Sequence, residues 1–100
     1  MGSCEFFHEA EGRTPKEAFL KAQNEAFYDH GHSGYTGTIA EKSDFIMIKV
    51  PEGNNPQDYA QELVDHNDER IDDKWGPAGC ILLKKGAKNN RYLFFGWASC

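Results

Sequence analysis

The sequence predicts one α+β domain, with elements in the order βαββαββ and two helices on one face of a mostly antiparallel sheet. Three observations lead to this class: two helix starts with clear capping residues, a series of short apolar runs, and turn residues between those runs. The 100 residues form a single domain covering positions 1–100, large enough for an adequate but not a generous core.

Both predicted helices begin at an N-cap residue followed by proline. Residues 14–17, TPKE, form a capping box with proline at the first helical position. Apolar residues at helical spacing extend this helix from Pro15 to about His30. Residues 55–56, NP, start the second helix in the same way, with Leu63 facing inward.

Short apolar or alternating runs predict the strands. They are Cys4–Ala10, Tyr35–Lys42, Phe45–Val50, Cys80–Lys84 and Arg91–Ala98. Ser43-Asp44 turns the second strand into the third, which predicts a hairpin, and the last two strands form another hairpin across Gly86–Asn90. The WGPAGC segment at 75–80 is a turn, because its proline stands between small residues.

Three of these strands are apolar on both faces, whereas a sheet with one wet face alternates apolar and polar residues. Two short helices are expected to cover one face only, so the other face is predicted to be covered by loops, by another subunit or by a partner, with an interaction surface as the preferred interpretation. The residues predicted for this interface lie in the last strand: Leu93, Phe95 and Trp97.

The segment Tyr28–Lys42, YDHGHSGYTGTIAEK, holds more polar chemistry than a simple connection needs. Backbone N–H groups in a glycine-rich turn can bind an anion, hydroxyl groups can add hydrogen bonds, and an aromatic ring can stack on a base. The segment nevertheless lacks both GxxxxGK[ST] and GxGxxG. The predicted ligand-binding residues are His32, Ser33, Gly34, Tyr35, Thr36, Gly37, Thr38 and Trp75.

Charge and cysteine content exclude several classes of protein. A formal net charge of -5 argues against nucleic-acid binding, and no apolar run is long enough to span a membrane. The three cysteines are widely spaced and include no CxxC, which favours reduced thiols and a cytoplasmic location.

Metal binding and catalysis receive weak support from the residue pattern. His30 and His32 could form a zinc site with His8, His66 or Cys80, but no second pair of ligands stands at the usual spacing. We therefore predict no metal and no cofactor.

Cys80 with a histidine would resemble a nucleophile and its base, yet Cys80 enters an apolar strand, where cysteine usually acts as a small hydrophobe.

Three segments, HGHSGYTGTIAEK, DDKWGPAGC and YLFFGWAS, together with the EAFLKAQNEA helix, resemble a family of small uncharacterised proteins from tailed bacteriophages and bacterial genomes. The resemblance covers nearly the whole chain. It implies a phage accessory protein in the host cytoplasm, with a role in counter-defence or host takeover. It assigns no activity to individual residues, because the family has no established activity.

The sequence therefore predicts a small non-enzymatic protein that self-associates, or docks on a host protein, through an apolar sheet face. One alternative is a binder of a nucleotide- or anion-like small molecule, using the Gly31–Thr38 loop. A hydrolase using Cys80 and a histidine is the other alternative.

Overall fold

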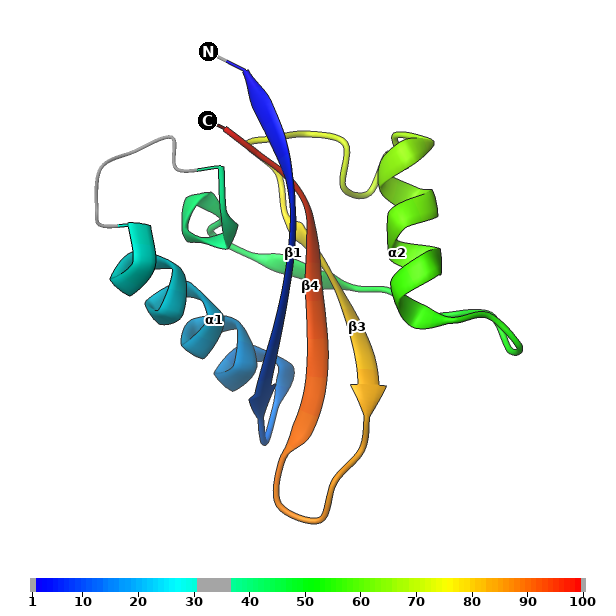
Figure 1. Cartoon of the computed structure of the whole chain (residues 1–100). Helices are drawn as coiled ribbons and strands as arrows, with labels where there is room; N and C mark the ends of the chain where they lie inside the picture. The colour runs from blue at the N-terminus through cyan, green and yellow to red at the C-terminus, as the bar shows by residue number, and fades with distance from the viewer. Residues whose placement is uncertain (1, 31–36, 100) are drawn as a thin grey trace.

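A computed structural model describes residues 2–30 and 37–99, except for the side chains of residues 29 and 30. The described residues form two α-helices, four strands and a short 3₁₀ helix, η1 (Figure 1). Their bounds are Ser3–Gly12 for β1, Pro15–His30 for α1, Ile39–Glu41 for η1, Phe45–Met47 for β2, Pro56–Asp65 for α2, Ala78–Lys84 for β3 and Asn90–Ser99 for β4.

The strands form one mixed sheet in the order β1-β4-β3-β2. The long central strand β4 is antiparallel to both β1 and β3. The edge strand β2 is parallel to β3 and pairs Phe45 with Ala78 and Met47 with Cys80. Parallel neighbours cannot be joined by a tight turn, and here the crossover between them carries α2.

The α+β class is confirmed, and α1 has the predicted bounds. The predicted strand Tyr35–Lys42 is wrong in its described part, because that part contains η1. Thr38 caps η1 with its hydroxyl, which accepts a hydrogen bond from the N–H of Ala40 at 3.2 Å. Without that strand β2 has no hairpin partner, and it pairs with β3 instead.

The two helices lie on opposite faces of the sheet, so the prediction of both helices on one face is wrong (Figure 1). Alternate residues of β4 point to opposite faces. Tyr92 and Phe94 pack with α1, whereas Leu93 and Phe95 pack with α2. The crossover from β2 to β3 thus places α2 over the face that α1 leaves bare.

The sheet accordingly has two apolar cores, which we name by the helix that covers each. The α1-side core contains Phe6, Ala10, Ala18, Phe19, Ala22, Ala26, Ile39, Ala78, Cys80, Tyr92, Phe94 and Ala98. The α2-side core contains Ile48, Ala60, Leu63, Val64, Ile71, Ile81, Leu93 and Phe95.

Glycine allows close packing at the centre of the α2-side core. Gly79 pairs with Phe95 across β3 and β4, and a Cβ atom added to Gly79 would lie 2.6 Å from the ring carbon Cζ of Phe95. The ring therefore occupies the space of the missing side chain. This explains why a glycine stands at position 79 of the WGPAGC segment, whereas Trp75 at the start of the same segment is 59% exposed.

Both predicted helix starts are formed as their sequences indicate. The hydroxyl Oγ1 of Thr14 accepts a hydrogen bond from the N–H of Glu17 at 3.1 Å. Likewise, Oδ1 of Asn55 accepts one from the N–H of Asp58 at 3.1 Å. Each bond satisfies a backbone donor that the first turn of a helix leaves without an intrahelical partner.

We expect Phe95→Ala to lower the free energy of unfolding by about 3–5 kcal/mol, because it empties a fully buried site beside Gly79. We expect Trp75→Ala to cost less than about 1 kcal/mol, since its ring is mostly exposed. Urea denaturation of both variants tests the pair. Equal losses of stability would contradict the described placement of the two rings.

Candidate functional site at the open edge of the sheet

Most of the predicted ligand-binding loop, residues His32–Thr36, lies outside the described residues. Its last two predicted residues are described and have structural roles. Gly37 has a φ of 72°, and its N–H donates a hydrogen bond to the carbonyl of Ser99 at 2.8 Å. Thr38 caps η1.

A buried lysine that the sequence analysis did not single out ties η1 to the loop containing Trp75. The ammonium group of Lys42 donates hydrogen bonds to three backbone carbonyls, those of Asp73 and Lys74 at 3.2 Å and that of Gly76 at 3.0 Å. The structure therefore brings Thr38 and the Trp75 loop to the same end of the molecule. A lysine in a polar run carries no sequence signal for such a role.

Burial lowers the pKa of Lys42 to about 8, and the nearby charge of Asp73 opposes this effect. The three carbonyl acceptors use all three ammonium protons. We therefore interpret Lys42 as a structural clamp between two loops.

The three residues predicted for the interface do not lie on a free apolar face. Leu93 and Phe95 are 2% and 0% exposed within the chain itself, beneath α2. Trp97 is partly buried and packs against the same core. The premise that two helices can cover only one face is wrong, because each helix covers a different face.

The histidines and Cys80 are not brought together. Nε2 of His8 lies 3.5 Å from Oε1 of Glu25, whereas His66 is the exposed C-cap residue of α2. Cys80 belongs to the α1-side core. Among the described residues no group of three or more His, Cys, Asp or Glu side chains could hold a metal ion. His32 lies outside these residues, as does the side chain of His30.

The cysteines differ from the expectation of reduced thiols. Cys4 in β1 is disulfide-bonded, whereas Cys80 is free and buried. Disulfides persist mainly in oxidising compartments, so this finding weakens the reason for predicting a cytoplasmic location. Burial also raises the pKa of the Cys80 thiol to about 12, which suppresses the thiolate that a nucleophile requires.

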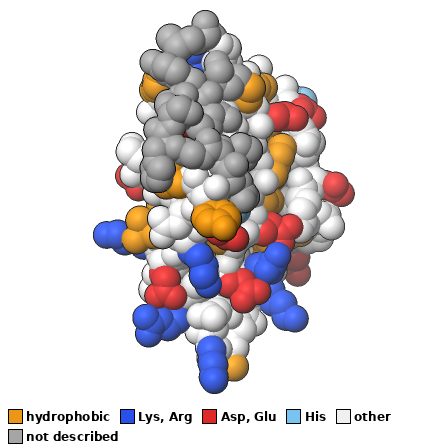
Figure 2. Space-filling model, turned by 60° about the vertical axis from the view of Figure 1, so that its left-hand side comes forward, with side chains coloured by type: hydrophobic (Ala, Val, Ile, Leu, Met, Phe, Trp, Pro, Cys, Tyr) orange, Lys and Arg blue, Asp and Glu red, His pale blue; other side chains and the backbone are white. Residues whose placement is uncertain are grey.

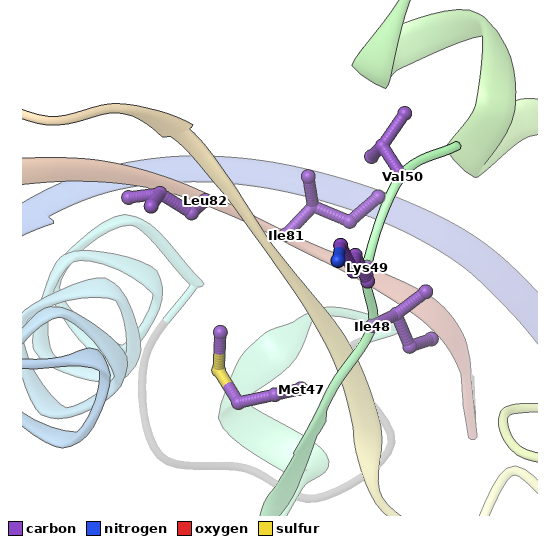
Figure 3. Close-up of a pocket in the computed structure, with 6 residues that line it drawn as sticks. All are labelled: Met47, Ile48, Lys49, Val50, Ile81 and Leu82. Atoms are coloured by element: carbon purple, nitrogen blue, oxygen red, sulfur yellow. The ribbon is translucent and has the colours of Figure 1, made fainter. Parts of the chain in front are cut away.

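The structural feature that best fits a binding role is a groove where β2 separates from β3. Figure 3 shows the residues that line it, and its volume is about 410 Å³. Its lining residues are Met47, Ile48, Lys49, Val50, Ile81 and Leu82. Ile48, Val50 and Ile81 belong to the α2-side core or pack against it. Met47 and Leu82 are 48% and 43% exposed. The groove thus has an apolar floor that is partly open to solvent.

The backbone of β3 is incompletely paired beside this groove. The N–H of Ala78 donates to the carbonyl of Asp44 at 3.0 Å, and the carbonyl of Cys80 accepts from the N–H of Ile48 at 2.8 Å. Alternate residues of a strand direct these groups to the same neighbour, so Leu82 directs its N–H and C=O toward the β2 side as well. The β2 ladder ends at Met47, and Leu82 has no backbone partner on that side in the described chain.

Positive charge lies close to this open edge. Lys49 lines the groove, and Lys84 and Lys85 follow Leu82 along the chain. Residues 80–90 contain three lysines and no carboxylate. None of Lys49, Lys84 and Lys85 forms an ion pair with a described carboxylate. By contrast, Arg91 is paired with Glu9 at 2.7 Å and Glu11 at 2.9 Å.

The surface on the α1 side of the molecule has fewer features of a binding site. In Figure 2, where this side is turned forward, hydrophobic side chains outside the grey atoms occur singly or in small groups among acidic and basic side chains. A second hollow of about 370 Å³ has its described lining on α1 alone: Lys21, Asn24, Glu25 and Tyr28. A mixed, mainly polar surface of this kind is typical of a solvated helix face.

No protein-family model matches the chain, and no curated protein or solved structure matches it either. None of the described helices is both long and apolar enough to cross a membrane.

We expect Lys42→Met to lower the free energy of unfolding by about 1–3 kcal/mol, because three partly buried backbone carbonyls lose their donor. The cost of burying the charge is fully present below about pH 8. It is relieved between pH 8 and the ordinary lysine value of 10.5, since the unfolded chain then binds more protons. The stability of the wild type relative to Lys42→Met should therefore rise across this window in denaturation experiments. A difference that does not change with pH would contradict the lowered pKa.

We expect Cys80 to react with iodoacetamide at pH 8 on the order of 1,000-fold more slowly in the native protein than in the urea-unfolded chain, because its thiolate is scarce. Peptide mapping by mass spectrometry measures modification at this position, with Cys80→Ala as the control. Comparable rates in the two states would restore the hydrolase alternative.

Proposed function

We propose that this protein is a non-enzymatic protein-binding module that docks its partner in the groove beside the open edge of β3. The observation that carries the proposal is the conjunction of unpaired backbone at Leu82 with exposed apolar side chains at Met47 and Leu82. A sheet edge of this kind can accept a further strand from another chain. The docking surface is thus an edge and its groove instead of the buried face of Leu93 and Phe95.

The lining of this groove favours binding over chemistry. Among the described residues, its lining is mostly aliphatic and contains one charged residue, Lys49, and no histidine, cysteine or carboxylate. Nucleophilic or acid–base catalysis needs such groups within hydrogen-bond reach of each other. The alternative of a nucleotide- or anion-like ligand rests mainly on loop residues that lie outside the described chain.

A phage accessory role is compatible with this proposal and rests on the sequence resemblance alone, whereas the disulfide at Cys4 weighs against a cytoplasmic location. Docking on a host protein through a sheet edge would require only a short extended segment of that protein. Self-association through the same edge is the competing form of the proposal.

We expect the purified protein to select binders from an unbiased library of displayed peptides, and we expect Met47→Glu to weaken their affinity by at least about tenfold. Tyr28→Glu is the matched control, because Tyr28 is 92% exposed on α1 and does not line the groove. Fluorescence anisotropy gives the affinities, and circular dichroism shows that both variants are folded.

The proposal is wrong if the library yields no peptide whose binding depends on Met47. It is also wrong if Met47→Glu and Tyr28→Glu weaken binding equally, since the peptides would then bind outside the groove.

A further inference from the structure

We infer that the partner presents an extended acidic peptide segment, which adds to the sheet as a strand beside Leu82. This inference rests on the proposed function and names the chemistry of the occupant. Three observations carry it: the direction of the free backbone groups, the position of the apolar side chains, and the sign of the neighbouring charge.

The backbone geometry favours an extended peptide. Leu82 directs one donor and one acceptor toward the position that β2 would occupy if it continued beside β3. A peptide strand in this position can accept from the N–H of Leu82 and donate to its C=O. It would extend the backbone pairing whose last hydrogen bond is that from Ile48 to Cys80. A helix uses its own backbone groups internally and offers no such pair.

Apolar side chains lie on both faces of the sheet at this edge. An added strand would contact both sets, because its own side chains alternate between the two faces. Met47 and Leu82 are exposed on the α1 side, whereas Val50 and Ile81 lie on the α2 side (Figure 3). An inserted strand would therefore place apolar side chains against aliphatic groups on either face. The groove volume of about 410 Å³ leaves room for several such side chains.

The charge favours an acidic segment. Lys49 lines the groove, and Lys84 and Lys85 extend the positive charge toward the end of β3. No described carboxylate pairs with them, so their charge is available to an incoming chain. The nearest carboxylate in the sequence, Glu52, follows Pro51 beyond the lining residues.

The same charge disfavours the competing occupants. Two copies pairing through this edge in a symmetric dimer would bring their lysines together, and like charges at an interface lower affinity. Nucleic acid would be attracted by the lysines, but a phosphate backbone has no donors and acceptors that match the Leu82 pair. An acidic peptide is the occupant that satisfies both the charge and the backbone.

The test uses two labelled five-residue peptides with the same apolar centre, Val-Leu-Val, flanked by Glu in one and by Lys in the other. We expect the acidic peptide to bind at least about tenfold more tightly at low salt, with the difference shrinking as salt screens the charges. The double variant Lys49→Glu/Lys84→Glu should reverse the preference. We expect N-methylation of the acidic peptide at its central leucine to weaken binding, because it removes a backbone N–H donor.

Amide hydrogen exchange followed by NMR provides the second readout. Binding of the acidic peptide should slow exchange at Leu82. The amide of Ile81 is the internal control, because Ile81 pairs with Leu93 of β4 whether or not the edge is occupied. Side-chain docking without strand addition would change neither amide.

The inference is overturned if both peptides bind equally, or if exchange at Leu82 is unchanged in the bound state. Library peptides that still depend on Met47 would leave the proposed function standing in either case. Competition by a single-stranded oligonucleotide for the same lysines, without protection of Leu82, would identify nucleic acid as the occupant. Sedimentation that shows wild-type oligomers abolished by Met47→Glu would identify a second copy.

Discussion

The constraint on which the structure depends is that the central strand β4 carries large apolar side chains on both faces. Phe94 packs on the α1 side and Phe95 on the α2 side, and both are fully buried. Such a strand is stable only in the middle of a sheet that is covered on both faces. The short chain meets this requirement by placing one helix on each face.

The open edge of β3 follows from the same constraint. Ile48 and Val50 pack with the α2-side core, and the chain turns away from β3 after Ile48, whose N–H still donates to the carbonyl of Cys80. β2 is therefore short, and Leu82, further along β3, has no described strand beside it on the β2 side. The groove occupies the space that this divergence creates. Coverage of the second face and exposure of the edge are thus two results of one change in chain direction.

Local signals made the helices predictable from the sequence, whereas the pairing of β2 required long-range information. Thr14 and Asn55 mark helix starts through bonds to residues three positions later. The Thr-Ile pair at 38–39 has strand propensity, yet the Thr38 hydroxyl caps η1. Tertiary contacts support that conformation, because Ile39 is buried in the α1-side core and Gln23 of α1 donates a hydrogen bond to its carbonyl. The groove was not predictable, since its walls are more than 30 positions apart in the sequence.

Lysines on a sheet edge have a simpler explanation, which is protection against association with other edges. Lys84 and Lys85 fit that explanation by themselves. Met47 and Leu82 do not, because exposed aliphatic side chains at an unpaired edge promote the association that lysine opposes. An edge under selection for exclusion alone would be polar at these two positions. Apolar contacts combined with positive charge instead attract an acidic, partly apolar strand and repel a basic one. Attraction of one partner and repulsion of another together produce specificity.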